Sequence, residues 1–265
     1  MTDLDASLRG GFCVGTISEL VGRAGVGKTQ LATQLCVANA AANGGTVYVD
    51  TEQKLSLSRL EEIAAERHRQ LPTYFRTSAV VLKNVAVRSA RSTQDLLETV
   101  RRLEEEILDT NLDADVEGGC FPVRLLVVDS IAAPARREFG EGSAPHRAAI
   151  VLRIARTLKR LADQLGLVVV VVNQVATTHL SSSYSSYGQE PSGIKAALGT
   201  SWHHCLSTRI FMENDMDLPQ QQGGQTTQKR RATIVKSNEV ALQTIPYEIT
   251  TQGVVPRAAR RIHRP

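Results

Sequence analysis

Aromatic residues, net charge and long apolar runs are all scarce in this sequence. Aromatics make up 4% of the 265 residues, and Val, Leu and Ala fill their place, as is typical of buried parallel strands packed against helices. No apolar run has the length of a membrane span and no secretory leader is visible, so we expect a soluble chain with no membrane partner. The formal net charge of +4 is too small to indicate nucleic-acid binding by itself.

The few cysteines give no sign of a disulfide framework or a zinc site. They are scattered, with no CxxC pair and no histidine at ligand spacing, so we expect reduced, buried thiols. The pair His203-His204 has no third ligand nearby in the sequence and is not interpreted as a metal site. The four cysteines are Cys13, Cys36, Cys120 and Cys205.

Apolar runs alternate with helical patterns, and the chain, 42% hydrophobic, is long enough for one large α/β core. Strands are expected at 16–21, 47–49, 84–87, 125–129 and 167–172. Helices are expected at 30–42, 57–70, 92–108 and 144–165. A capping box at Ser92 and Asp95 is expected to start the third of these helices. The alternation of strands and helices predicts a mostly parallel sheet flanked by helices. Residues 208–212 and 232–236 are expected to pair, which adds a C-terminal antiparallel hairpin extension.

One segment between a predicted strand and a predicted helix fits G-x-x-x-x-G-K-[ST], the phosphate-binding loop of nucleotide triphosphatases. Its glycines let backbone N–H groups turn toward phosphate oxygens, and the N-terminus of the following helix adds partial positive charge. Lys28 is expected to reach the β- and γ-phosphates, and the Thr29 hydroxyl to hold Mg²⁺. The segment reads Gly22, Arg23, Ala24, Gly25, Val26, Gly27, Lys28 and Thr29.

Three polar residues at the ends of predicted strands supply the rest of a hydrolytic site. Asp129 follows the apolar strand 125–128 and is expected to complete the Mg²⁺ shell, although a strand-ending Asp can also serve only as a cap. Glu52 follows the strand next after the loop and is our candidate to polarise the attacking water. Gln174 ends the third buried strand, where an amide either binds a γ-phosphate or only satisfies nearby backbone.

These elements occur in the order and spacing of the RecA-type recombinase core, and the chain resembles that family over nearly its whole length. The resemblance implies ATP and Mg²⁺ as ligands, Gln30 in the nucleotide site and Arg59 against the adenine. It further implies that Glu52 is the catalytic carboxylate and that Gln174 is the γ-phosphate sensor. The matching segments are 4–11, 27–31, 50–52, 129–130 and 173–175.

Longer and less generic segments resemble one branch of that family, the recombinase paralogues typified by X-ray repair cross-complementing protein 3. They are 131–139, 143–145 and 197–202. This resemblance implies homologous recombination repair in the nucleus, with a cytoplasmic pool. It also implies assembly with another paralogue, as a heterodimer or larger complex, to help load or stabilise the main strand-exchange recombinase on single-stranded or branched DNA.

Family recombinases carry an N-terminal helical domain and a polymerisation linker, and this sequence begins about 20 residues before the phosphate loop. We therefore expect a RecA-like ATPase core over 1–256 without either element. The basic end, 257–265, is expected to be a nucleic-acid or targeting element or a functionless tail.

The family's DNA-facing loops should correspond to 136–147 and 176–197. Glu141 stands between two glycines where recombinases have an arginine, and a carboxylate there repels phosphate, so we expect weak DNA binding by the chain alone. A plain flexible loop is the alternative interpretation of the second segment. The candidate DNA contacts are Arg136, Arg137, Arg147, Lys195, Tyr184 and Tyr187.

Lys236, in the turn before the last hairpin, is a candidate to cap the ATP of a neighbouring subunit, with an exposed strand-end lysine as the alternative. Two other functions stay open besides the paralogue. One is an ATP-dependent recombinase that forms its own filament, and the other is an ATP-binding interaction module with little hydrolysis. The presence of Glu52, Asp129 and Gln174 argues against complete loss of catalysis, and we expect a weak ATPase.

Overall fold

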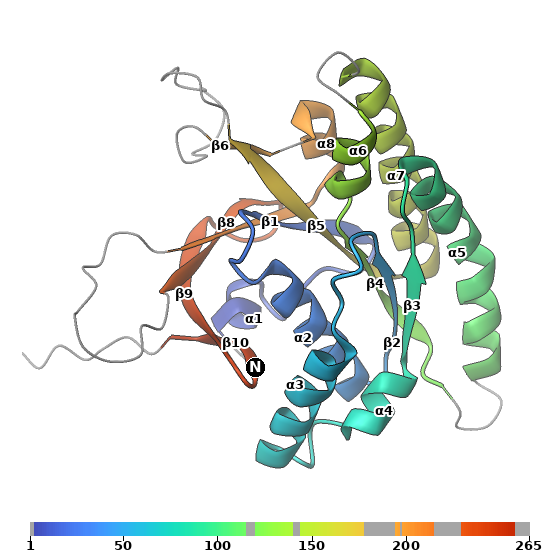
Figure 1. Ribbon diagram of the computed structural model, residues 1–265. Helices are drawn as coiled ribbons and strands as arrows, with labels where there is room; N and C mark the ends of the chain where they lie inside the picture. The colour runs from blue at the N-terminus through green and yellow to red at the C-terminus, as the bar shows by residue number, and fades with distance from the viewer. Residues whose placement is uncertain are drawn as a thin grey trace, which may run out of the picture.

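A computed structural model describes residues 3–114, 120–139, 144–177, 194–196, 198–214 and 229–257. Within these residues, ten strands form a sheet of order β10-β9-β8-β7-β1-β5-β4-β2-β3, and β6 pairs with β5 off this path (Figure 1). The strands are β1 (Thr16–Gly22), β2 (Gly45–Asp50), β3 (Val85–Ser89), β4 (Val123–Asp129), β5 (Val168–Thr177), β6 (Ile194–Ala196), β7 (Thr208–Asn214), β8 (Arg230–Ser237), β9 (Gln243–Thr250) and β10 (Gly253–Pro256).

The sheet has a parallel part and an antiparallel part. Strands β3, β2, β4, β5, β1 and β7 run parallel to their neighbours, and β7 to β10 continue as antiparallel pairs. The predicted pairing of 208–212 with 232–236 is β7 with β8. The predicted fold class is therefore confirmed.

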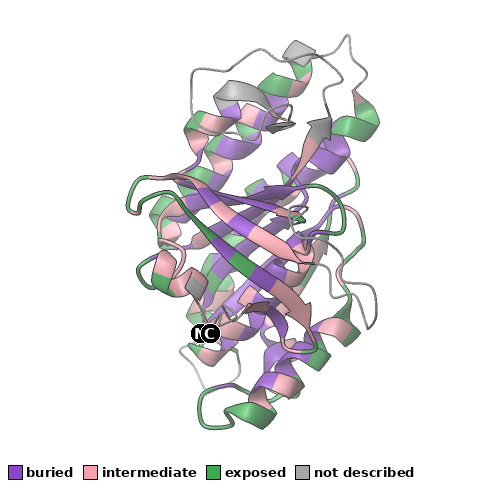
Figure 2. Ribbon diagram, turned by 90° about the vertical axis from the view of Figure 1, so that its left-hand side faces the viewer, coloured by how far each residue is buried: buried purple, intermediate pink, exposed green. Residues whose placement is uncertain are grey.

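Helices cover both faces of the parallel part, because side chains of its strands alternate between two cores (Figures 1 and 2). On β4, Leu126 and Val128 belong to the core under α5 to α8, whereas Leu125 and Val127 belong to the core under α1 to α4. The helices are α1 (Asp3–Ser7), α2 (Lys28–Ala41), α3 (Leu57–Gln70), α4 (Ser78–Lys83), α5 (Thr93–Ala114), α6 (Ala132–Glu138), α7 (Ala144–Leu165) and α8 (Gly199–Cys205).

The predicted elements differ from the observed ones mainly at their ends. Helix α5 starts as expected, with the Asp95 N–H donating to Ser92 Oγ at 2.8 Å, but it runs to Ala114 rather than to residue 108. Strand β5 continues to Thr177 instead of ending at residue 172, because β1 pairs with it as far as Gln174 and β6 pairs with it beyond. Apolar periodicity marks the buried part of an element and not its polar end.

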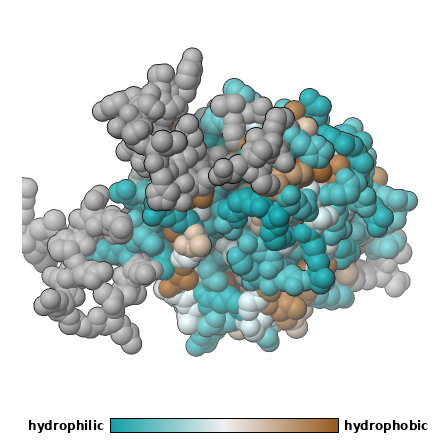
Figure 3. Space-filling model, turned by 45° about the horizontal axis from the view of Figure 1, so that its top comes forward, coloured by the Kyte–Doolittle hydropathy of each residue, from teal (hydrophilic) through white to brown (hydrophobic). Residues whose placement is uncertain are grey.

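The surface is mostly hydrophilic on the face shown in Figure 3, with hydrophobic atoms in scattered patches. No helix in the described part of the chain is long and apolar enough to cross a membrane. The four cysteines are free, as expected, but the expectation that they are buried is wrong for Cys120, which is exposed, and holds fully for Cys36.

A buried carboxylate joins the middle of the sheet. Glu19 on β1 has no exposed surface, and its oxygens accept hydrogen bonds from Asn173 Nδ2 at 2.7 Å, Trp202 Nε1 at 2.6 Å and Arg209 Nε at 2.5 Å. These donors come from β5, α8 and β7. A buried charge needs such compensation, since an ion without partners costs several kcal/mol in a low-dielectric interior.

We predict that Glu19→Ala lowers the free energy of unfolding by about 3–5 kcal/mol, because it leaves the Arg209 guanidinium buried without this carboxylate. The matched control is Glu213→Ala on the same strand as Arg209, since the Arg231–Glu213 pair has side chains 36% and 21% exposed. Glu213→Ala should lower the free energy of unfolding by less than about 1 kcal/mol.

Urea denaturation measures both values, and Glu19→Gln, which keeps an acceptor for Asn173 and Trp202, should fall between them. Equal losses for Glu19→Ala and Glu213→Ala would contradict the stabilising role of the buried carboxylate.

Candidate nucleotide-binding site

The phosphate-binding loop lies between the end of β1 and the start of α2, and two of its glycines are required by the packing around it. Gly27 has φ of 103°, and a Cβ there would lie 2.6 Å from Ile249 Cδ1. A Cβ on Gly22 would lie 2.1 Å from the Met212 carbonyl oxygen. Only glycine fits both positions, so the two glycines of the motif are needed for the conformation and packing of the loop.

Lys28 is folded against this loop. Its ammonium donates to the carbonyl oxygens of Gly22 at 2.9 Å and Arg23 at 2.7 Å, and the residue is 7% exposed. Burial lowers the pKa of Lys28 to about 8, and the carboxylates of Asp129 and Glu52 oppose this decrease. The loop therefore holds a cation beside the N-terminus of α2, whose first turn carries no acidic residue.

Asp129 and Thr29 meet as predicted for a metal site. Thr29 Oγ1 donates to Asp129 Oδ2 at 2.7 Å, and the buried hydroxyl of Tyr48 donates to the same oxygen at 2.9 Å. Burial raises the pKa of Asp129, and the two hydrogen bonds oppose the increase. A hydroxyl and a carboxylate are the hard oxygen ligands that Mg²⁺ prefers, so these residues fit that ion.

Glu52 and Gln174, the two predicted catalytic residues, also lie together. Gln174 Nε2 donates to Glu52 Oε2 at 3.1 Å, and Lys54 Nζ contacts Glu52 Oε1 at 3.0 Å. The loop that carries Glu52 is fixed by Asp50, whose carboxylate accepts the N–H of Glu52 at 3.1 Å and of Leu55 at 2.9 Å. Asp50 is thus a support for the site, which its place beside Glu52 in the sequence did not reveal.

Arg59 and Gln30 are in contact, as expected for two residues of one nucleotide site. Arg59 Nε donates to Gln30 Oε1 at 2.7 Å, and the Arg59 guanidinium also binds the Thr250 carbonyl. Arg67, two turns further along α3, donates from Nε to the Gln252 carbonyl at 2.9 Å. Two arginines of α3 therefore bind the turn between β9 and β10 and hold the C-terminal hairpin beside the loop.

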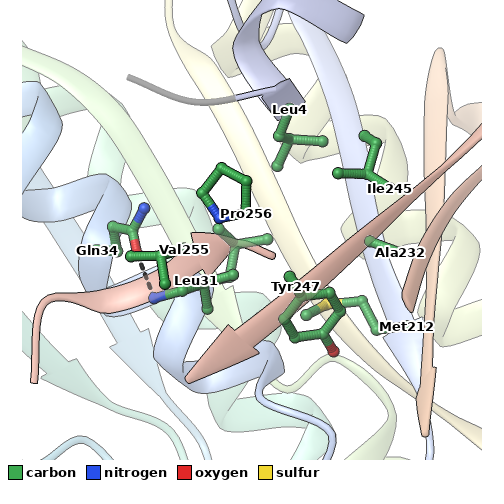
Figure 4. Close-up of a pocket in the computed structure, with 10 residues that line it drawn as sticks. Leu4, Leu31, Gln34, Met212, Ala232, Ile245, Tyr247, Val255 and Pro256 are labelled. Carbon is green, nitrogen blue, oxygen red and sulfur yellow. Dashed lines mark hydrogen bonds between the residues drawn. The ribbon is translucent and has the colours of Figure 1, made fainter. Parts of the chain in front are cut away.

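Tyr247 on β9 supports the loop from this hairpin. Its hydroxyl donates to the Val26 carbonyl at 2.5 Å, and the residue is 2% exposed. Figure 4 shows Tyr247 among Leu31, Met212 and Ala232, beside a cavity of about 30 Å³. That volume suits about one water and not a nucleotide, so the cavity is a packing gap under the site.

Two of the predicted DNA contacts lie close to the hydrolytic residues. The charge of Arg136 acts on Lys28 and Glu52, and Arg137 donates to the Thr51 carbonyl. Arg136 and Arg137 lie exposed on α6, and Arg147 is half-buried on α7. The backbone of Lys195 pairs with Ala176 across β5 and β6. Three predicted positions fall outside the described residues: Glu141, Tyr184 and Tyr187.

Lys236 lies away from the chain's own phosphate loop. Lys236 on β8 lies opposite Arg209 on β7, and Arg209 lies opposite Glu19 on β1. Lys236 is therefore two strands away from β1, at the level of a residue that comes before Gly22, where the loop begins. Lys236 Nζ donates to the His203 carbonyl at 2.7 Å. Its role toward a neighbouring subunit stays a prediction.

His203 lies beside two cations. Burial and the nearby cations of Arg209 and Lys236 lower the pKa of His203 to about 4, and its Nδ1 lies 3.0 Å from Arg209 Nη1. Among the described residues, no cluster of three or more His, Cys, Asp or Glu side chains is placed to hold a metal ion.

We predict that Tyr247→Phe weakens ATP binding about three- to fivefold, because the loop loses one buried hydrogen bond worth about 1 kcal/mol. Titration calorimetry measures the affinity, and Tyr74→Phe, at a residue with 57% exposure, is the control. Unchanged affinity in Tyr247→Phe would show that the hairpin does not support the loop.

We predict that ATP affinity falls as the pH rises from 7 to 9.5. The free chain loses the Lys28 proton near pH 8, and only the ammonium attracts phosphate, so binding takes up a proton above that pH. The pKa of Lys28 also affects folding, since it is 10.5 in the unfolded chain and about 8 in the folded chain. Between these values the unfolded chain holds more protons at Lys28 than the folded chain does. The contribution of Lys28 to the free energy of unfolding therefore increases with pH in this range. Titration calorimetry of the wild type at pH 7 and 9.5, in buffers of different ionisation enthalpy, measures both the affinity and the protons taken up, and binding without proton uptake at pH 9.5 would contradict the effect.

The chain is similar to known proteins over almost its whole length. The family model for Rad51 matches residues 1–256. DNA repair protein RAD51 homolog 2 of Mus musculus is 31% identical over 285 residues, which cover 97% of this chain and 74% of that protein. DNA repair protein XRCC3 of Bos taurus is 30% identical over 260 residues, which cover 95% and 72%. The predicted resemblance to recombinase paralogues is thereby confirmed, and the chain belongs to the Rad51 family of RecA-type ATPases.

Proposed function

We propose that this chain is an ATP-binding recombinase paralogue of homologous recombination repair. It assembles with a second paralogue in the nucleus and helps to load or stabilise the main strand-exchange recombinase on single-stranded DNA. The observation that carries the proposal is the meeting of Thr29 with Asp129, and of Glu52 with Gln174, in a chain whose relatives include DNA repair proteins RAD51 homolog 2 and XRCC3.

Each residue has a role that its position supports. Lys28 and the first turn of α2 bind the triphosphate by charge and by free N–H groups. Thr29 and Asp129 hold Mg²⁺, which when bound neutralises charge on the phosphate oxygens. Glu52 accepts a hydrogen bond from the attacking water and orients it.

The hydrogen bonds of Glu52 support slow turnover. Both of its carboxylate oxygens are engaged in this structure, one by Gln174 and the other by Lys54. Each carboxylate oxygen has two lone pairs, so these bonds compete with the attacking water for Glu52 without excluding it. A γ-phosphate can accept the hydrogen bond that the Gln174 amide donates to Glu52 in this structure. The Gln174 side chain would then respond to the bound nucleotide, as expected of a γ-phosphate sensor.

The placement of Lys236 supports assembly with another subunit. Because this cation lies away from the chain's own loop, the ATP that it would stabilise belongs to a neighbour. The expected repulsion of phosphate by Glu141 supports a partner rather than DNA as the first contact of this chain.

Two variants test the proposal in the complex purified from its source. Glu52→Gln should keep ATP binding and lose at least about tenfold of steady-state phosphate release, because the amide is a poor base. Lys28→Ala should abolish ATP binding and weaken assembly with the partner, which is identified as the protein that stays bound at high salt.

If the Lys28→Ala variant assembled and functioned like the wild type, the nucleotide site would have no role. Long regular filaments of this protein alone on single-stranded DNA with ATP, seen by electron microscopy, would favour the strand-exchange alternative.

A further inference from the structure

The peptide unit between Thr51 and Glu52 is held on both sides. Arg137 Nη2 donates to the Thr51 carbonyl at 3.1 Å, and the Glu52 N–H donates to Asp50 Oδ1 at 3.1 Å. Rotation of this unit would move the Glu52 side chain. The two hydrogen bonds therefore fix the point from which the predicted catalytic carboxylate projects.

Thr51 is also fixed through its other polar atoms. Its N–H donates to the Asp129 carbonyl at 2.8 Å. Its hydroxyl donates to the Ser130 carbonyl at 2.7 Å and accepts the Ser130 N–H at 2.9 Å. The residue before Glu52 is thus joined to the end of β4, and Arg137 completes this set by binding the one polar atom that β4 does not reach.

Arg137 reaches Thr51 from an anchored helix end. The same Nη2 also donates to the Arg91 carbonyl at 2.9 Å, so one nitrogen joins the segments that follow β2 and β3. The neighbouring Glu138 accepts the Thr93 N–H at 2.8 Å, which attaches the last turn of α6 to the start of α5. A charged donor forms stronger hydrogen bonds to carbonyls than a neutral one does.

We propose that Arg137 is a positioning residue for Glu52, acting through the Thr51 carbonyl. The sequence assigned this arginine to DNA contact, and the structure gives it a place behind the hydrolytic site. The inference rests on the proposed ATPase function. Small displacements of a catalytic group have large effects on rate, so the part-buried hydrogen bond from Arg137 to the Thr51 carbonyl matters here.

The test compares Arg137→Gln with Arg160→Gln in the full chain with its partner. Arg160 is a suitable control because it is half-exposed and its ion pair, with Glu104 at 2.8 Å, joins α7 to α5. Arg137→Gln should lower kcat for ATP hydrolysis about tenfold with KM unchanged, because the residues that bind the triphosphate are untouched. Arg160→Gln should leave both constants unchanged.

A second measurement does not depend on ATP. In the free chain, Arg137→Gln should speed hydrogen–deuterium exchange of the amides of Glu52, Lys54 and Leu55, which Asp50 holds, and Arg160→Gln should not. Affinity for single-stranded DNA should be the same in both variants.

Unchanged exchange and kcat in Arg137→Gln would overturn the inference. A loss of DNA affinity with unchanged kcat would also overturn it, and would return Arg137 to the DNA contacts. If the wild type shows no turnover that Glu52→Gln abolishes, the ATPase proposal fails instead, and amide exchange still decides whether Arg137 holds this loop.

Discussion

The site depends on the register of the parallel sheet. Asp50 pairs with Asp129 across β2 and β4, and Gly22 pairs with Gln174 across β1 and β5. Since parallel strands end at one edge of a sheet, this register alone brings residues up to 152 positions apart to the same place. A shift of one residue would turn Asp129 to the opposite face and would bury it among the residues under α5 to α8.

Two carboxylates inside an apolar sheet are tolerated for different reasons. Glu19 is surrounded by donors, including the Arg209 guanidinium, and links four elements without facing any ligand. Among the described residues, Asp129 accepts hydrogen bonds from two neutral hydroxyls, and burial raises its pKa. A carboxylate left short of positive charge gains from a divalent cation, so Asp129 is the one of the two that is suited to a metal.

Much of the site could be predicted from the sequence, because its residues stand at strand ends or in a local motif. The loop, Asp129, Glu52 and Gln174 all belong to this class, and the parallel α/β pattern already places them at one edge. Tyr48 and Tyr247 could not be found in this way. Tyr247 contacts Val26 from 221 residues away, and a tyrosine inside an apolar strand looks like any other core residue.

The role of Arg137 also could not be predicted from the sequence. Its position within a predicted DNA-facing loop suggested phosphate binding, because a sequence shows the charge of an arginine but not the carbonyls that surround it. In the fold, α6 turns its last residues toward the ends of β2 and β3, where strand ends leave carbonyl groups such as those of Thr51 and Arg91 to be satisfied.

Glu52 is held by two kinds of contact, one to its backbone and one to its carboxylate. Its backbone is held by Arg137 and Asp50, which a nucleotide has no reason to displace, and its carboxylate is held by Gln174 and Lys54. Both side-chain partners are donors that a γ-phosphate can bind, and the Gln174 amide is the one that lies on a strand of the sheet. Under the proposed ATPase function, the Glu52 side chain can therefore exchange its partner while the hydrogen bonds from Arg137 and to Asp50 keep its backbone in place.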